Sequence, residues 1–308
     1  MSDTAQPDAA RPNAAAPSPE STKAKAPSAA PAADALPELV RFDKVTKSFG
    51  EGPEARVAIQ DVTFVVHDLP GQGELVAIVG QSGCGKSTIL RLIAALRPHF
   101  PPTSGEVKVF GQPVAHPGAD RGMVDQKYSL MPHLTVRDNI AFGLLLRGVA
   151  LKERRDRAGE WAKKVGLDGC ENKYPSELSG GMQQRVSIAA TLILEPKILL
   201  MDEPFGALDP KIRMQMQELL VQLWKEQQST VFIVTHSVDE AIYLGDRVLR
   251  MAARPGRLIE SLQLPRPDMS PEAMRKKPWF NELSQELLRR LETDAPASGE
   301  LPGLEKWR

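Results

Sequence analysis

A glycine-rich segment in the first third of the chain has the residue types and spacing of a phosphate-binding loop. Residues 80–87 read GQSGCGKS, which matches the pattern GxxxxGK followed by Ser or Thr. Glycines let the backbone fold tightly, so that its N–H groups point at phosphate oxygens. We expect Lys86 to reach the β- and γ-phosphates and the Ser87 hydroxyl to ligate Mg²⁺. The residues predicted to bind the nucleotide here are Gly80, Gln81, Ser82, Gly83, Cys84, Gly85, Lys86, Ser87 and Thr88.

A glycine-rich turn with a solvated lysine is the alternative interpretation of this segment. The flanking sequence disfavours it, because the apolar run at residues 74–79 predicts a buried strand and residues 88–96 predict a helix. A helix N-terminus directly after the loop adds partial positive charge that favours a phosphate. For Cys84 a small space-filling role is preferred over a redox switch.

A pair of carboxylates follows a second apolar run. Residues 198–201 read ILLM, predict another buried strand and are followed directly by Asp202 and Glu203. The carboxyl ends of strands are where α/β sheets bind ligands, and neighbouring side chains on a strand point in different directions. We therefore expect Asp202 to serve Mg²⁺ and Glu203 to be the general base for an attacking water. Two adjacent acids alone are equally compatible with ordinary surface charge, and the upstream phosphate loop favours the site.

Strands that alternate with helices are predicted to position these groups. Residues 40–42, 59–66 and 231–234 have the β-branched and aromatic content of strands. Helical patterns occupy residues 210–225 and 238–244. The alternation indicates a mainly parallel sheet that is covered on both faces.

The middle and the two ends of the chain differ from this pattern. Residues 134–194 carry no convincing strand, and Thr135 is a plausible N-cap for a helix through Leu146. We therefore predict an inserted helical subdomain at about residues 127–194. Residues 1–37 are mostly Ala and Pro and predict a disordered tail. Residues 266–308 form an extension with an amphipathic helix, which we expect to pack on the domain or to contact a partner; its apolar residues are Phe280, Leu283, Leu287 and Leu291.

Composition excludes several classes of protein. The 308 residues carry a formal net charge of zero, which argues against a binder of nucleic acid. Only two cysteines are present, so a disulfide scaffold is not expected and a reduced cytoplasmic compartment fits. We find no signal-peptide pattern and no apolar run of the roughly 18 to 20 residues that span a bilayer.

A second glycine motif carries a family resemblance. Residues 178–185 read LSGGMQQR, in which Ser179 can cap a helix while Gly180 and Gly181 permit close approach of another backbone. This stretch resembles the LSGGQ signature of ABC ATPases. The resemblance implies a P-loop NTPase of the ABC ATPase type over residues 38–265, with a mainly parallel core sheet, an antiparallel β subdomain and the inserted helical subdomain. It also implies a head-to-tail dimer, with a second copy or a homologous subunit, that holds Mg-ATP between one phosphate loop and the other signature.

Other family motifs follow in the expected order. Gln126 matches the Q-loop, Asp209 the D-loop and His236 the switch histidine, while Phe49 stands where the family stacks an aromatic ring on adenine. The implied catalytic residues are Glu203, His236, Gln126 and Lys86. The implied metal ligands are Ser87, Gln126 and Asp202. An ordinary core role for Phe49 is the alternative.

Four further segments are similar to importers of nitrate, sulfonates and taurine: residues 131–140, 239–247, 254–257 and 278–280. The resemblance implies a peripheral subunit on the cytoplasmic face of the membrane, which drives an integral-membrane permease supplied by a periplasmic or surface solute-binding protein. Four positions depart from the family pattern without removing a catalytic group: Phe49, Asp125, Ala190 and Ser237. Asp125 is expected to alter the contact with the permease. The alternatives are a motor for an exporter or for lipid movement, a non-transport ABC ATPase and an inactive scaffold subunit, and the transported substrate is not determined.

Overall fold

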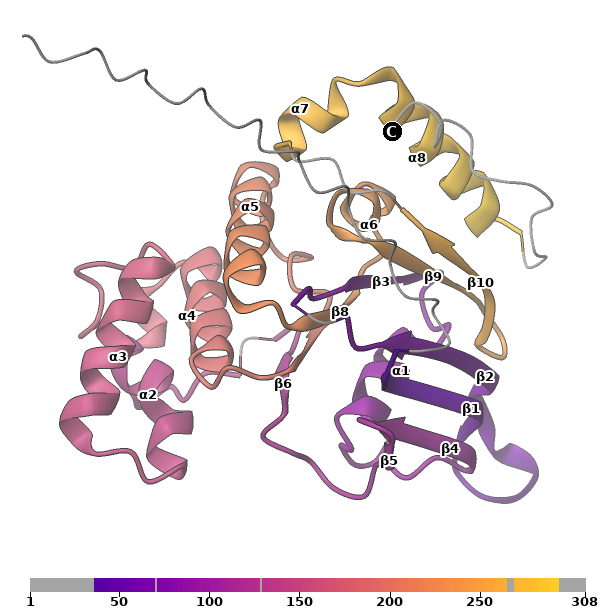
Figure 1. Cartoon of the computed structure of the whole chain (residues 1–308), viewed down its shortest axis with the longest axis horizontal. Coiled ribbons are helices and arrows are strands. Elements are labelled where there is room, and N and C mark those ends of the chain that lie inside the picture. Colours follow the sequence, from indigo (N-terminus) through magenta and orange to yellow (C-terminus); the bar gives the residue numbers. More distant parts are fainter. Residues whose placement is uncertain (1–35, 70, 128, 265–268, 294–308) are drawn as a thin grey trace, which may run out of the picture. The chain divides into compact units, whose positions relative to one another are not determined.

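The computed structural model describes residues 36–69, 71–127, 129–264 and 269–293 (Figure 1). The predicted tail at residues 1–37 lies outside the described residues except for its last two. The last 15 residues of the C-terminal extension also lie outside them. The helices, strands and contacts of the chain are those of these described residues.

A six-stranded, mainly parallel sheet carries the strands that lead to the predicted site. Its order is β10-β9-β3-β8-β7-β6, with only β10 antiparallel to its neighbour. The predicted buried strands are confirmed, because β3, β7 and β8 are buried at every position. The sequence patterns missed β6, β9 and β10. The bounds are β3 Leu75–Gly80, β6 Arg121–Val124, β7 Ile198–Asp202, β8 Thr230–Val234, β9 Arg247–Ala252 and β10 Arg257–Gln263.

A four-stranded sheet in the order β2-β1-β4-β5 is antiparallel throughout. The predicted strands at residues 40–42 and 59–66 lie inside β1 and β2, which are each 12 residues long and are connected through the short helix η2. The rings of Phe42 and Phe64 stack 4.6 Å apart between these two strands. The bounds are β1 Glu38–Phe49, η2 Gly52–Glu54, β2 Arg56–His67, β4 Ser104–Val109 and β5 Gln112–Pro113.

The helix after the phosphate loop, α1, spans Lys86–Ile93 rather than the predicted residues 88–96. It begins two residues early because Gly85 has a φ of 87°, which lets the chain turn into the helix directly from the loop. It ends early because Ala95 takes a φ of 57°, which a right-handed helix does not allow.

The middle of the chain is helical, and the described residues between β6 and β7 contain no strand. Thr135 caps the first helix by accepting a hydrogen bond from the Asp138 N–H at 3.2 Å, as predicted. The helices are α2 Val136–Leu146, α3 Leu151–Lys164, η3 Pro175–Glu177 and α4 Gly180–Leu192.

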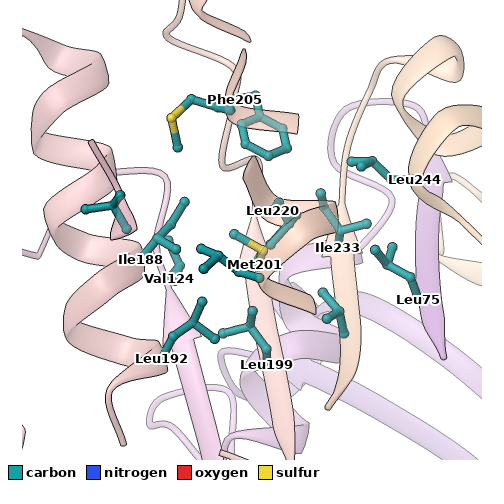
Figure 2. Close-up of a cluster of buried hydrophobic side chains, with 14 of the residues drawn as sticks. Leu75, Val124, Ile188, Leu192, Leu199, Met201, Phe205, Leu220, Ile233 and Leu244 are labelled. Atoms are coloured by element: carbon teal, nitrogen blue, oxygen red, sulfur yellow. The ribbon is translucent and has the colours of Figure 1, made fainter. Parts of the chain in front are cut away.

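Strand periodicity divides the core into two clusters on opposite faces of the main sheet. In β7, Leu199 and Met201 pack with α4, α5 (Pro210–Gln227) and α6 (Val238–Leu244), as Figure 2 shows. The alternate residues Ile198 and Leu200 pack with α1 and the antiparallel sheet. The main sheet is therefore a middle layer that holds the carboxyl ends of its strands rigidly.

The C-terminal segment adds two helices, α7 Pro271–Arg275 and α8 Pro278–Leu291. The apolar residues Phe280, Leu283 and Leu287 of α8 are buried, whereas Leu291 is half-buried. They join the cluster that contains α6, so this face of α8 packs within the chain. The Ser284 hydroxyl donates to Asp239 Oδ1 at 3.1 Å and adds a polar contact to the same surface.

The Glu286 carboxylate on α8 is expected to stabilise the folded state at neutral pH but not in acid. Glu286 accepts hydrogen bonds from Arg289 and Arg290, which lower its pKa from 4.5 to about 2. The folded state therefore favours the ionised form, so the stabilisation is present above pH 4.5 and is lost as the pH falls toward 2. We expect Glu286→Gln to lower the free energy of unfolding at pH 7 by about 1 kcal/mol or less, because the Arg289 partner is 67% exposed and the buried Arg290 keeps a second carboxylate, Glu260, at 3.4 Å.

Urea unfolding curves at pH 7 and at successively lower pH measure this difference. The gap between wild type and Glu286→Gln should shrink below pH 4.5. Glu292→Gln removes an exposed carboxylate at the end of the same helix and is the control. A gap that stays constant with pH would contradict the assigned ion pair.

Candidate active site

The predicted phosphate loop connects β3 to α1 and requires its glycines. A Cβ on Gly85 would lie 2.3 Å from Ile59 Cγ2, and one on Gly80 would lie 2.6 Å from Cys84 Sγ. Gly83 and Gly85 also have φ values of 80° and 87°, where other residues are strained. Cys84 is fully buried beneath the loop, and its burial raises the pKa of the thiol.

The lysine of the loop is held in place by the loop itself. Lys86 Nζ donates to the carbonyl oxygens of Gly80 at 2.9 Å and Gln81 at 3.1 Å. The side chain is 6% exposed, which excludes the alternative of a solvated lysine. Its ammonium charge is therefore fixed in position by the first two residues of the loop.

A cavity of about 510 Å³ opens beside this loop. Of the predicted nucleotide-binding residues, Phe49 and the loop residues 82, 83 and 85–88 line it, together with the predicted base Glu203. Phe49 is the last residue of β1 and directly precedes the loop between β1 and β2, so an aromatic ring stands at the edge of the cavity. The lining also contains Arg56 and Ala58 from β2, which the sequence analysis did not select.

The buried carboxylate of the pair lies against the loop serine. Ser87 Oγ donates to Asp202 Oδ1 at 2.7 Å, across 115 residues of sequence. Burial raises the pKa of Asp202, while the hydrogen bond from Ser87 and the charge of Arg91 lower it. Arg91 Nη2 lies 3.4 Å from Asp202 Oδ2. Helical spacing offered a signal for Arg91, which follows Ser87 by four residues on α1.

The predicted base meets both predicted neighbours. Gln126 Nε2 donates to Glu203 Oε2 at 3.2 Å, and His236 Nδ1 lies 3.7 Å from the same oxygen. These residues follow β6, β7 and β8, three adjacent parallel strands whose carboxyl ends share one edge. Glu203 has a φ of 47°, a left-handed conformation that is unusual for a non-glycine residue, and its N–H donates to Val234 O at 3.0 Å. The backbone turn therefore fixes where this carboxylate leaves the strand.

A buried acid that the sequence analysis did not select supports the histidine. Glu240 accepts hydrogen bonds from Thr235 Oγ1 and, at 3.2 Å, from Gln217 Nε2. Thr235 Oγ1 also accepts from the Ser237 N–H at 3.0 Å, and Ser237 caps α6. The backbone on both sides of His236 is therefore tied to this acid. Ser237 and Glu240 have the S-x-x-E spacing of a capping box, which is a local signal for this acid, whereas Gln217 meets it only in the fold.

Asp125, one of the departures from the family pattern, takes part in contacts within the chain. Asp125 Oδ1 lies 3.9 Å from Arg91 Nη2, and Ser129 Oγ donates to Asp125 Oδ2 at 3.3 Å. Through Arg91 the Q-loop is therefore connected to Asp202, the carboxylate beside the loop serine.

The signature residues do not line this cavity. Ser179 caps α4 by accepting a hydrogen bond from the Met182 N–H at 3.4 Å. Ser179 and Gly180 are exposed, Gly181 is half-buried, and Asp209 is an exposed cap of α5. The structure thus brings together the loop, Phe49, both carboxylates, Gln126 and His236, but leaves the signature and Asp209 outside the cavity of their own chain.

Comparisons with known proteins bear on this arrangement. Residues 46–206 match the model of the ABC transporter family. An uncharacterized ABC transporter ATP-binding protein of Methanocaldococcus jannaschii is 44% identical over 263 residues, which cover 84% of this chain and 96% of that protein. This chain belongs to the ABC transporter family. It is an ATP-binding and ATP-hydrolysing subunit of that family.

Further relatives of this ABC ATPase are import proteins. The nitrate import ATP-binding protein NrtD of Synechocystis is 48% identical over 72% of this chain and 86% of its own length. The taurine import ATP-binding protein TauB of Rhizobium johnstonii is 50% identical over 67% of this chain and 76% of its own length.

A solved structure of a related ATPase confirms the predicted fold class. The ATP-binding cassette MJ0796, in a dimeric post-hydrolysis state bound to ADP and Pi, superposes with a TM-score of 0.64 at 34% identity, covering 74% of this chain and 99% of that one. Among the described residues of the ABC ATPase, no helix is both long and apolar enough to cross a bilayer.

Arg56 is expected to contribute to nucleotide binding. It pairs with Phe49 across the β1–β2 ladder, and its Nη2 atom lies 4.0 Å from where a Cβ on Gly83 would stand. A guanidinium group at this place can donate to phosphate or ribose oxygens. We expect Arg56→Ala to raise the Kd for ATP about tenfold, the effect of losing one charge-assisted hydrogen bond.

Titration with a fluorescent ATP analogue measures this change. The control is Arg41→Ala, which removes another arginine of the antiparallel sheet that pairs with Glu38 and does not line the cavity. Equal affinities for the two variants would show that Arg56 does not contact the nucleotide.

Proposed function

We propose that this ABC ATPase energises solute import through an integral-membrane permease, for a solute of the nitrate, sulfonate or taurine type. The observation that carries the proposal is the identity of 41–50% to import ATP-binding proteins of these three solutes. The complete set of charged and polar groups around the cavity supports an active motor over an inactive scaffold subunit.

Phe49 and the phosphate loop are proposed to bind different parts of ATP. The Phe49 ring stacks on adenine, because only its π-face is needed. The loop N–H groups and Lys86 hold the phosphates. The Lys86 ammonium group contacts carbonyl oxygens and the Cys84 sulfur of its own loop and can turn to a phosphate. Phosphoryl transfer relies mainly on positioning and charge stabilisation, which a rigid loop between β3 and α1 supplies.

Glu203 is proposed to be the general base. Its carboxylate lines the cavity and can take a proton from a water directed at the γ-phosphate. Gln126 and His236, both directed at Glu203 Oε2, orient this water and the carboxylate. Glu240 and Ser237 hold the histidine loop and thereby support the geometry.

The donor set around Ser87 fits Mg²⁺. A hydroxyl and a carboxylate oxygen 2.7 Å apart, with the Gln126 amide on the neighbouring strand end, are the hard oxygen ligands that Mg²⁺ prefers. Among the described residues no cluster of three or more His, Cys, Asp or Glu could hold a metal, so the remaining ligands would be phosphate oxygens and water. The bound ion would neutralise charge that develops on the phosphates.

A second copy, or a homologous subunit, is proposed to complete the site. The signature residues 179–181 and Asp209 lie outside the cavity of their own chain, and α4 presents an N-terminus that suits an anion. The dimeric state of the related cassette MJ0796 supports this assembly. ATP would then be held between the phosphate loop of one copy and the signature of the other.

Closure of this dimer is proposed to move the permease through the Q-loop. Gln126 contacts Glu203 in the site, and its neighbour Asp125 contacts Arg91. The Q-loop, which would meet the permease, is therefore in contact with the catalytic groups. The subunit is proposed to sit peripherally on the cytoplasmic face of the membrane, with a solute-binding protein acting on the far side.

A pull-down of the tagged chain from detergent-solubilised native membranes tests the proposal. Mass spectrometry should identify a multi-span permease, whose sequence would narrow the substrate, and the untagged strain is the control. Co-purification with only soluble or ribosomal proteins would overturn the transport role while leaving the ATPase chemistry in place.

A further inference from the structure

The C-terminal end of α8 lies against the phosphate loop. Gln81 Nε2 donates to the carbonyl oxygen of Leu291, the last residue of α8, at 3.4 Å and across 210 residues of sequence. The last carbonyls of a helix lack partners inside the helix, so this bond satisfies one of them. A residue of the loop that holds the phosphates is therefore in direct contact with the C-terminal extension.

A buried arginine fixes this end of the helix. Arg250 is 1% exposed and donates from Nη1 to the carbonyl oxygens of Arg290 at 2.6 Å and Thr293 at 2.8 Å. Its Nε donates to Glu260 at 2.8 Å, and Glu260 also pairs with Arg290 at 3.4 Å. Cations at a helix C-terminus are favoured by the helix dipole. The end of α8 is thus anchored by charge as well as by its apolar face.

Arg250 is close in the sheet to the start of the phosphate loop. Arg250 lies on β9 and is paired in register with Val79 of β3, the residue before Gly80. Strand β3 leads directly into the loop, so the residue that holds the end of α8 stands on the strand next to the one from which the loop starts. Gln81 therefore contacts α8 from the loop itself, while Arg250 holds the same end of α8 from the neighbouring strand β9.

The middle of α8 contacts α6, the helix that begins two residues after His236. Ser284 Oγ donates to Asp239 Oδ1 at 3.1 Å, and Asp239 is in the first turn of α6, three residues after His236. Helix α8 lies beside α6 in Figure 1, and residues of both helices share one buried cluster. One helix thus touches both the phosphate loop and α6, the helix that follows the predicted switch histidine His236.

We propose that α8 positions the nucleotide site, with Arg250 as the positioning residue that holds its end against Gln81. Docking of α8 and binding of nucleotide are then coupled, so that each strengthens the other. This inference rests on the proposed placement of the phosphates in the loop Gly80–Ser87. Coupling is reciprocal: if a docked α8 raises nucleotide affinity, bound nucleotide must stabilise the docking of α8 by the same factor.

Hydrogen exchange on the full-length protein tests the reciprocal effect. ADP is the probe, because it occupies the loop without the γ-phosphate that the proposed dimer closure needs. We expect ADP to slow amide exchange in residues 278–291 several-fold relative to the free protein. Unchanged exchange in this helix, together with slowed exchange in the phosphate loop, would overturn the coupling.

Two neighbouring leucines of α8 allow a test of whether the docking of this helix changes the affinity for nucleotide. Leu287 is fully buried and Leu288 is 52% exposed on the same helix, and neither lines the cavity. Leu287→Ala leaves a cavity under α8 and loosens it, whereas Leu288→Ala makes the same substitution in solvent. We expect Leu287→Ala to raise the Kd for ADP and the KM for ATP three- to tenfold with kcat within about twofold of wild type, and Leu288→Ala to change neither.

Two further variants keep the outcomes distinct. Ser284→Ala removes only the bond to Asp239 and should raise the Kd for ADP less than Leu287→Ala, and it serves if Leu287→Ala does not fold. Lys86→Ala reports on the phosphate placement itself. If Lys86→Ala abolishes ADP binding but Leu287→Ala and Leu288→Ala bind equally, α8 does not position the site. If Lys86→Ala binds ADP like wild type, the phosphate placement is wrong instead.

Discussion

Replacing Glu203 with glutamine should reduce ATP turnover by about 100- to 10,000-fold, the range for losing a general base, while the affinity for ATP stays close to wild type. Glutamine keeps the size of the side chain and can still face Gln126 and His236, which contact Glu203 Oε2 in the wild type. It cannot accept the proton of the attacking water. The change therefore falls on kcat rather than on ATP binding.

The same variant should accumulate as an ATP-bound dimer, because hydrolysis is the step proposed to reopen it. Steady-state ATPase assays measure turnover, and size-exclusion chromatography with and without ATP measures the dimer. Glu195→Gln is the control, since its carboxylate is 74% exposed and pairs only loosely, at 3.7 Å, with Arg157. Full ATPase activity in Glu203→Gln would falsify the assignment of the base.

Replacing Lys86 with alanine should weaken ATP binding by at least about 100-fold, roughly 3 kcal/mol. The loop itself positions the ammonium group of Lys86, a residue that is 6% exposed. Hydrogen bonds to charged groups contribute about 1.5–3 kcal/mol, and this variant loses the charged donor and leaves only the loop N–H groups to hold the phosphates. Isothermal titration with ATP measures the affinity.

A surface lysine provides the matched control for this change. Lys108 pairs with Glu106 at 3.0 Å on β4 and is partly exposed, so Lys108→Ala should leave ATP binding unchanged. Thermal unfolding of both variants shows whether the fold is kept. Lys86→Met retains the apolar stem of the side chain and separates the loss of charge from loss of packing. An ATP affinity within threefold of wild type for Lys86→Met would contradict the proposed role.

The short-range features of this protein were determined by the sequence alone. The loop 80–87 could be predicted because its residue types and spacing match a known pattern between an apolar run and a helical pattern. The buried strands β3, β7 and β8 are short apolar runs with clear boundaries, and the Thr135 cap depends on the Asp138 N–H three residues away. Such signals depend on neighbours in the chain.

Elements whose sequence carries little local signal were missed. β6 is four residues long and contains a glycine and an arginine, so neither an apolar run nor an alternating pattern marks it. Its place at the edge of the sheet is set by pairing with β7. Without β6 the sequence could assign Gln126 only by family resemblance and not by position.

Only the tertiary structure decided which groups meet. The order of β6, β7 and β8 brings Gln126, Glu203 and His236 to one edge of the main sheet. The register of β1 against β2 places Arg56 opposite Phe49. The anchoring of α8 by Arg250 joins residues 40 or more positions apart, and its contact with Gln81 spans 210. Contacts between distant residues arise from the packing of whole elements, which no local pattern of residue types encodes.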